Sequence, residues 1–240
     1  SGGGGGGGGI YVGNVNLGSD TDRDATITIG GGGIPHRHSN GQVGTAGGGS
    51  SFVLNSQFRI DANGGGVGSW SGATTAGAGG SGGSASVSDG SATVSVTELE
   101  RRTGGTGGAG VAYNSTNSAN SGLGGTSNAQ WFGGSYSGGG GGGATQYNST
   151  SRPGGSGVNG GGNGGGGFSN NRATSFAVAG RISSGGGGGA GSAHGDTSLY
   201  SINGESYHSR DGKSGGEGVV QIMFDATYTV TFAAGTNGTG

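Results

Sequence analysis

The apolar residues of this chain fall into short segments with a two-residue alternation. Residues 24–30 (DATITIG) alternate Ala and Ile with Thr, and residues 91–99 (SATVSVTEL) alternate Ala and Val with Ser and Thr. Such alternation predicts half-buried β-strands. Residues 50–62 and 174–182 are each apolar enough for one strand, and residues 218–232 are typical of two successive strands. No segment shows a helical period, so we expect essentially no α-helix.

A β-hairpin is predicted near the C-terminal side of the chain. Asn203-Gly204 lies at the centre of residues 198–208, SLYSINGESYH. Asn-Gly between two alternating segments is a strong short-range hairpin signal, because both residues tolerate the positive φ angles of the turn.

Glycine runs separate these apolar segments. Glycine supplies 72 of the 240 residues, whereas proline supplies only 2. Without proline and a strict three-residue period the chain is not collagen. Hydrophobic residues make up 27%, too few for an apolar core throughout. The runs occupy residues 2–9, 30–33, 47–49, 64–68, 77–83, 104–110, 122–125, 138–143, 154–167, 185–191 and 212–218.

These runs predict a bundle of polyglycine helices in the polyproline II conformation, joined by loops and a few short strands. That helix has three residues per turn and no internal hydrogen bonds, so its N–H and C=O groups are free to bond to neighbouring helices. Residues 2–9 would span ~25 Å at its rise of ~3.1 Å per residue. The alternative is that the runs are linkers between small hairpins.

The few aliphatic residues near the two ends of the glycine-rich region predict a closing contact. Val219, Val220 and Ile222 would leave apolar surface in water unless they pack against a partner. We expect that partner to be the strand near Ile10 and Val12, because the termini of a domain tend to lie close together.

Charge and composition exclude several classes of function. The net charge is −2 and 9% of residues are charged, so no basic patch for nucleic acid is present. The longest apolar stretch, near residues 219–224, is too short for membrane insertion. Cysteine is absent, which excludes disulfides and thiolate ligands. No cofactor motif has the strand and helix around it that it requires, so we expect no cofactor.

The sequence offers little support for catalysis. Ser81 lies in a G-x-S-x-G match, but a chain this rich in Gly and Ser gives that match by chance, and no strand-to-helix pattern surrounds it. Glu98 and Glu100 lie beside Arg101 and Arg102, so mutual charge pairing is the plain expectation for them. We therefore expect no enzymatic activity.

Three alternating carboxylates give a weak metal candidate. Asp20, Asp22 and Asp24 have the spacing of the first ligands of a calcium loop. The glycine that should follow is Ala25, and the position of the bidentate glutamate is Gly31. A solvated acidic turn is the favoured interpretation, and no metal site is predicted.

Single aromatic residues in the polar segments are the better functional candidates. An aromatic ring on a rigid loop can stack on a sugar or anchor a protein contact. The alternative is that each ring packs over the edge of the glycine bundle and shields its hydrogen bonds from water. The receptor-binding candidates are Trp70, Tyr113, Trp131, Phe132, Tyr136 and Tyr147.

The order of the glycine-rich segments resembles a known family. GGGGGGGGIYV, ATITIGGGGIP, GQVGTAGGGSSFVLNSQFRIDANGGGVGS and GKSGGEGVVQI are similar, in that order, to the glycine-rich domain of phage tail and tail-fibre proteins. The resemblance implies a polyglycine II sandwich, as in the tip adhesins of T-even-like phages, with distal loops that bind bacterial surface receptors. Residues 226–240 resemble the start of an internalin-type bacterial surface repeat. We therefore expect a glycine-rich domain over 1–224 and the start of a following β module over 225–240.

These features together favour a non-enzymatic, extracellular domain that displays loops for binding a cell-surface receptor, either a glycan or an outer-membrane protein. It would belong to a virion tail fibre or a bacterial cell surface, as part of a larger fibre or multidomain chain. The first alternative is a structural subunit of a secreted filament or stalk. The second is ice binding, which polyglycine II bundles perform in one antifreeze class by means of a flat face of small residues.

Overall fold

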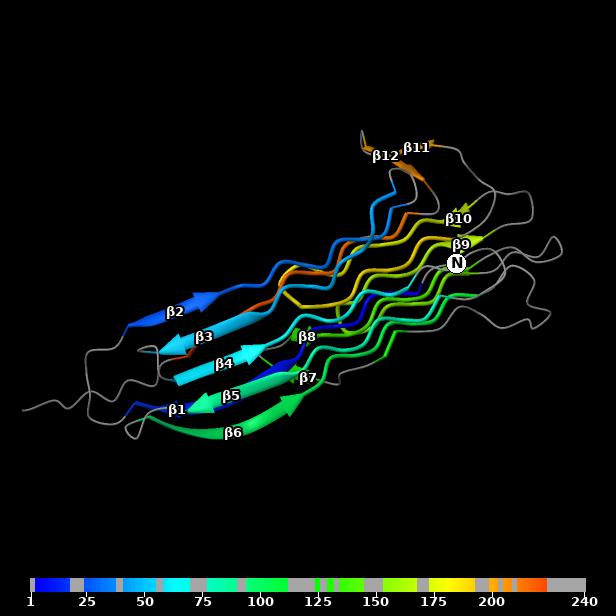
Figure 1. The fold of residues 1–240 in the computed structure, drawn as a ribbon. Coiled ribbons are helices and arrows are strands. Elements are labelled where there is room, and N and C mark those ends of the chain that lie inside the picture. The colour runs from blue at the N-terminus through cyan, green and yellow to red at the C-terminus, as the bar shows by residue number, and fades with distance from the viewer. Residues whose placement is uncertain are drawn as a thin grey trace, which may run out of the picture.

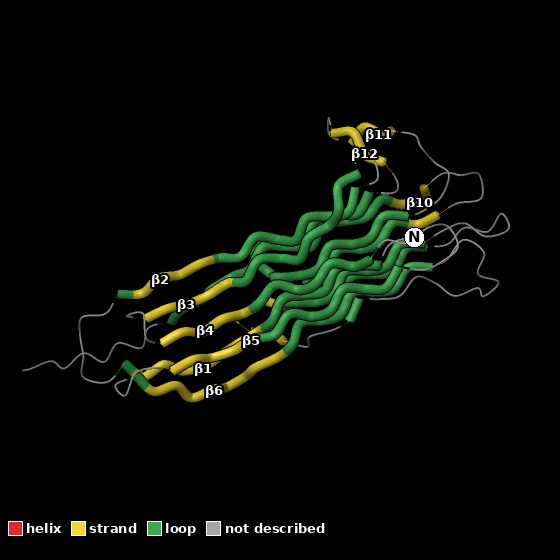
Figure 2. Tube along the Cα trace, in the orientation of Figure 1, coloured by secondary structure: helices red, strands yellow, loops and turns green. Residues whose placement is uncertain are grey.

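The structure is a computed structural model, which describes residues 3–17, 24–37, 41–54, 58–69, 77–89, 94–111, 124–125, 129–131, 134–144, 153–167, 173–192, 199–202, 205–208 and 211–223. These residues contain strands and extended segments but no helix, as the alternation predicted. No helix long and apolar enough to cross a membrane therefore occurs among them. Figures 1 and 2 show an elongated block in which β1–β6 lie at one end and continue directly into extended segments, whereas β9–β12 lie at the other end.

All strand pairs are antiparallel. A four-stranded sheet has the order β2-β3-β4-β5, and four further pairs are β1–β6, β7–β8, β9–β10 and β11–β12. The strands are β1 Ile10–Asn16, β2 Ala25–Thr28, β3 Ser50–Leu54, β4 Phe58–Ala62, β5 Ala85–Asp89, β6 Ser95–Arg102, β7 Ala129–Trp131, β8 Gly134–Tyr136, β9 Gly166–Gly167, β10 Ala173–Ser175, β11 Leu199–Ile202 and β12 Glu205–His208.

The N-terminal glycine run is hydrogen-bonded to its neighbours with a period of three. The amides of residues 3, 6 and 9 donate to the carbonyls of residues 69, 66 and 63; those of residues 4 and 7 donate to 108 and 105; and those of 5 and 8 donate to 188 and 185. All seven distances are 2.8–3.0 Å. Consecutive amides thus point to three different neighbours, which is the geometry of a helix with three residues per turn.

This run lies inside the block, in a layered packing of parallel axes. The sheet strands β2, β3, β4 and β5 continue into one layer of extended segments, and β1 and β6 continue into the layer beneath it. Residues 3–9, which lead into β1, contact segments of both layers and of a third layer. Their neighbours are residues 63–69, 78–84, 104–108, 137–141 and 185–188.

Close approach of backbones explains why the interior runs contain only glycine. Residues 137–144 are all buried, and six of the eight are glycine. A Cβ on Gly140 would lie 2.1 Å from the carbonyl oxygen of Gly188, far inside van der Waals contact. The residues that do carry side chains close this run at its two ends, Ser137 and Ala144.

A small apolar core lies where the strands replace the glycine runs. Phe58 is fully buried, together with Leu54 and Val94. Phe52 meets Phe58 edge to face, with ring centroids 6.5 Å apart. This core joins the four-stranded sheet to β1 and β6 through the partly buried residues Val15, Leu17, Phe52, Ile60, Val87 and Val96.

Several strand predictions are confirmed and others need correction. β2 and the β11–β12 hairpin occur as predicted, with Ile202 opposite Glu205. Residues 50–62 form two strands instead of one, because β3 and β4 pair with each other. Of residues 174–182, only the first two belong to a strand, β10, and the segment then joins the glycine layers, where Val178 and Gly180 donate to neighbouring carbonyls.

Two further predictions also need correction. The strand expected over residues 91–99 runs over Ser95–Arg102. The closing contact is wrong: β1 pairs with β6, whereas Gly218 donates to the carbonyl of Gly30, next to β2. Gly185 lies between the two segments, because its carbonyl accepts from the amide of Gly8 and its own amide donates to the carbonyl of Glu217. The segment that begins at Gly185 therefore separates the N-terminal run from the closing segment.

Candidate functional site

The described ends of many extended segments gather at one end of the block, which we call the loop end. Gly3 donates to Ser69, Ser69 to Ala78, and Gly110 to Gly77. The series continues with Val111 to Gly143, Ala144 to Gly165 and Gly165 to Ala190. These lateral bonds place the segment ends side by side, at the end opposite β1–β6 (Figure 1).

Three of the six aromatic candidates follow these ends in the sequence. Trp70 comes directly after Ser69, Tyr113 comes two residues after Val111, and Tyr147 comes three residues after Ala144. All three lie outside the described residues. What the fold establishes is that the connections 70–76, 112–123 and 145–152 start from one end of the same scaffold.

The other candidates belong to the β7–β8 hairpin. Trp131 pairs with Gly134 through the backbone, its side chain lies outside the described parts, and Phe132 lies outside them altogether. The Tyr136 ring covers Gly134, because a Cβ there would lie 2.4 Å from the Tyr136 hydroxyl oxygen. The Tyr136 ring therefore lies against the backbone of its own hairpin.

The β7–β8 hairpin is tied to a distant turn of the bundle. The Arg181 guanidinium donates to the carbonyl of Ser135 at 2.6 Å. Beside it, the Ser184 hydroxyl donates to the carbonyl of Arg181, and the amide of Ser137 donates to the carbonyl of Ser184. The hairpin leaves the run 137–144 at its Ser137 end, away from the loop end.

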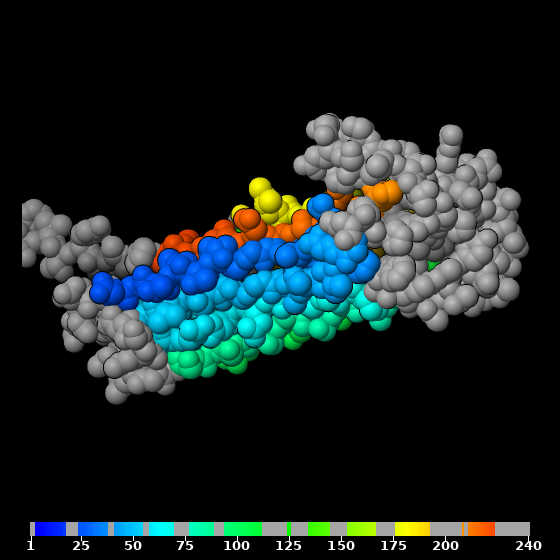
Figure 3. Space-filling view, turned by 45° about the horizontal axis from the view of Figure 1, so that its top comes forward, coloured from blue at the N-terminus to red at the C-terminus, as the bar shows by residue number. Residues whose placement is uncertain are grey.

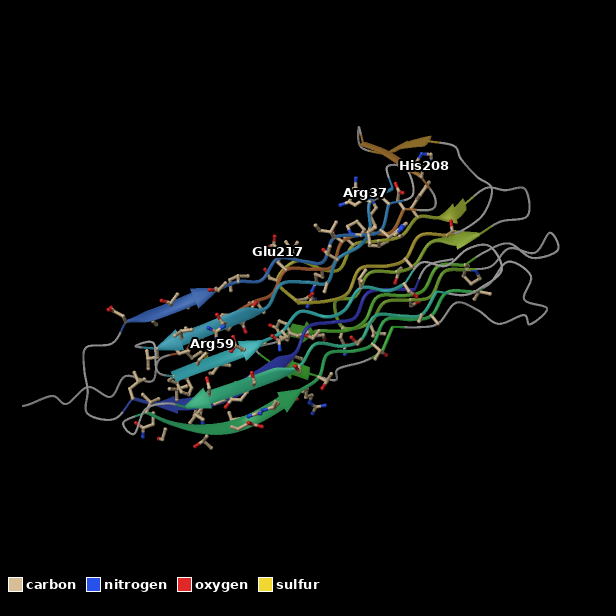
Figure 4. All side chains as sticks on the ribbon, in the orientation of Figure 1. Arg37, Arg59, His208 and Glu217 are labelled. Carbon is tan, nitrogen blue, oxygen red and sulfur yellow. The ribbon has the colours of Figure 1, made fainter. Side chains whose placement is uncertain are left out.

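The acidic candidates do not form a cluster in the described structure. Asp24 is exposed directly before β2, and Asp20 and Asp22 lie outside the described residues. Among the described residues, no three His, Cys, Asp or Glu side chains are arranged to hold a metal ion. Figure 4 shows Glu217 and Arg59 at separate places along the block, both away from Arg37 and His208.

The acidic and basic residues of β6 pair as predicted. Arg101 forms an ion pair with Glu98, and Arg102 forms one with Glu100. Arg101 also lies over the Tyr11 ring of β1, 5.6 Å from its centroid. Burial raises the pKa of the Tyr11 phenol above its ordinary value of 10.0, the charge of Glu98 raises it further, and Arg101 opposes them. Of these contacts, that of Arg101 with Tyr11 joins β6 to β1, whereas both ion pairs lie within β6.

Sequence reasoning missed a surface of small side chains. In residues 103–111, Thr103, Thr106 and Ala109 are exposed, and most of the residues between them are buried. The adjacent segment repeats this pattern with exposed residues at 78, 81 and 84. A spacing of three residues places them ~9.3 Å apart along a polyproline II axis. The signal was present as the local repeat TGGTGGAG.

Comparison with known proteins gives one match. No curated protein and no solved structure matches this chain. A family model described as glycine-rich domain matches residues 1–225, which includes every described segment. The chain therefore belongs to the glycine-rich domain family.

Proposed function

We propose that this chain is a non-enzymatic, extracellular adhesin-type domain, in which a rigid glycine bundle displays loops that bind a cell-surface receptor. The observation that supports this is the gathering of segment ends at the loop end. The connections that start there combine Asn, Ser and Thr with single Trp or Tyr residues. Such a composition suits adaptable recognition, because the aromatic ring supplies contact area and the small polar residues supply hydrogen bonds.

The scaffold suits this role because it is rigid along its length. Each interior run is hydrogen-bonded to several neighbours, so a loop attached to one run cannot shift without the others. Rigid attachment lowers the entropy that a binding loop loses when it meets its receptor. A glycan or an outer-membrane protein would be held by rings stacked on its surface.

The finer assignment follows the resemblance in sequence. Similarity to the glycine-rich domain of phage tail proteins favours a tail-fibre tip. The internalin-like character of residues 226–240 favours a bacterial surface protein. In either setting the domain is part of a larger fibre or multidomain chain.

Binding of the purified protein to bacterial cells and to a glycan array tests the proposal. We expect binding, and we expect its loss when Trp70, Tyr113 and Tyr147 are replaced together by Ala with the melting temperature unchanged. A second variant, Trp131→Ala with Tyr136→Ala, tests the hairpin. Leu99→Ala, an exposed change on β6 outside both groups, is the control. Absence of binding to any cell or glycan, or binding unaffected by both aromatic variants, would contradict the proposal.

The surface of small side chains supports ice binding as a second candidate. Exposed Thr, Ser and Ala at a regular three-residue spacing are small, uncharged side chains of the kind that this alternative requires. Thermal hysteresis of the purified protein tests it, with Thr106→Lys as the disrupting variant. No hysteresis in the unmodified protein would remove this candidate.

A further inference from the structure

The strand β2 has an open edge. Its ladder within the described residues is with β3 on one side only, and all four of its residues are exposed. Figures 1 and 2 show β2 as the outermost strand of the sheet. An edge strand presents a row of backbone N–H and C=O groups that can pair with another chain.

This edge lacks the devices that usually prevent such pairing. Residues 25–34 contain no charged residue and no proline, and the β2–β3 register contains no bulge. The strand β6 of the same molecule differs in this respect, because it is rich in charged residues. Four of its last five residues are charged, namely Glu98, Glu100, Arg101 and Arg102. Charged side chains at an edge discourage edge-to-edge association.

Exposed apolar side chains also lie in and near β2. Ile27 and Ile29 are each 48% exposed, and Ile222 and Met223 are 40% and 76% exposed. Residues 212–218 run antiparallel to residues 30–36, so residues 219–223 lead back along β2. Gly218, where this stretch begins, lies against a face of the sheet, because a Cβ on it would lie 2.1 Å from the Ser50 hydroxyl of β3. Figure 3 shows this closing segment beside β2.

We infer that this edge is a self-association site, at which β2 of a second copy of the chain pairs antiparallel with β2. The edge requires an extended, uncharged segment with aliphatic residues at alternate positions. β2 itself, with Ala25 and Ile27 alternating with threonines, has that chemistry, and two identical uncharged edges meet without like-charge repulsion.

The pairing follows from the two-fold symmetry. Opposite residues of an antiparallel pair lie on the same face of the sheet. A pair centred on Ile27 therefore places Ile27 opposite its own copy and Ala25 opposite Ile29 of the second copy. The two four-stranded sheets become one continuous sheet, and the two copies of Ile27 are buried against each other. The inference does not depend on receptor binding.

Sedimentation equilibrium with matched charge variants tests the inference. We expect the unmodified protein to be a dimer, Ile27→Lys to be a monomer, and Leu99→Lys to remain a dimer. Leu99 is the control because it is 50% exposed, almost the same as Ile27, but lies on the charged strand β6. An unmodified protein that stays monomeric, or an Ile27→Lys variant that stays dimeric, would overturn the inference.

Cross-linking gives a second readout that does not require the strand to tolerate a charge. The chain has no cysteine, so Ile27→Cys introduces a single thiol. Opposite Cβ atoms in an antiparallel pair are about 4.5–5.5 Å apart, within reach of a disulfide after a small adjustment. We expect Ile27→Cys to give a covalent dimer on oxidation and Leu99→Cys to remain uncross-linked. Equal cross-linking of the two variants, or none at Ile27→Cys, would contradict the proposed pairing.

Discussion

Replacing Gly140 by alanine tests whether close backbone packing holds this protein together. Gly140 lies in the buried run 137–144, where its amide donates to the carbonyl of Gly5 and its own carbonyl accepts from Gly108. A Cβ at this position would lie 2.1 Å from the carbonyl oxygen of Gly188 and 3.0 Å from that of Gly187. Both neighbours are backbone atoms, so no side chain can move aside to make room.

The cost of this change follows from the displacement it requires. Ordinary van der Waals contact begins at 3.4 Å, so the segments that contain Gly140 and Gly188 must separate by 3.4 − 2.1 = 1.3 Å. That separation disrupts lateral hydrogen bonds, and each buried group left unsatisfied costs about 1–3 kcal/mol. With two bonds affected, we expect Gly140→Ala to lower the free energy of unfolding by about 2–6 kcal/mol.

Gly31→Ala is the matched control. No atom other than those of its chain neighbours lies within 4 Å of a Cβ on Gly31, which is exposed. The change also removes conformational freedom from the unfolded chain, which stabilises by about 0.4–1 kcal/mol where the native conformation allows it. Urea denaturation followed by circular dichroism measures both variants. Equal effects of Gly140→Ala and Gly31→Ala would refute the close-packing argument.

Four further predictions concern the strands and turns. Phe58→Ala should lower the free energy of unfolding by about 3–5 kcal/mol in urea denaturation, because the ring is fully buried in the only apolar cluster that the described residues form. The raised pKa of Tyr11 means that the folded state holds its phenolic proton longer than the unfolded state does. Stability should therefore be lost as the pH rises from about 10 through the folded pKa, and a pH series of melting temperatures should show a smaller loss for Tyr11→Phe. Asn159 has φ 44°, so Asn159→Val should cost about 1–2 kcal/mol and lower the melting temperature. Arg181→Ala removes the bond to Ser135 and should increase amide exchange in the β7–β8 hairpin without changing exchange at Gly5.

The architecture was predictable to the extent that it depends on local chemistry. Alternation identified β2, and Asn-Gly identified the β11–β12 turn. Glycine runs with no side chains to pack identified the bundle, because lateral hydrogen bonds are what such runs can form. The sequence could not show which run contacts which. Every glycine amide is chemically the same, and no side chain encodes the pairing of residues 3–9 with five neighbours.

Where the predictions failed, tertiary contacts outweighed local pattern. Residues 218–222 were expected beside β1 because of their aliphatic content. The turn that ends at Gly185, with φ 62°, instead places another segment of the same chain between residues 218–222 and β1. Residues 50–62 were expected to form one strand because of their apolar content, although β3 and β4 pair with each other. The candidate aromatics were recognisable by type alone, and only the fold shows that Trp70, Tyr113 and Tyr147 follow segments that end together.

Residue-resolved amide exchange over residues 103–111 is the most direct test of the polyproline II packing. The amides of residues 104, 107 and 110 donate to residues 83, 80 and 77, and those of 105, 108 and 111 donate to 137, 140 and 143. In the described structure, the exposed residues Thr106 and Ala109 donate no backbone hydrogen bond. The packing therefore predicts two protected amides followed by one unprotected amide, repeated along the segment. Uniformly fast exchange, or protection at every second residue as in an edge β-strand, would contradict it.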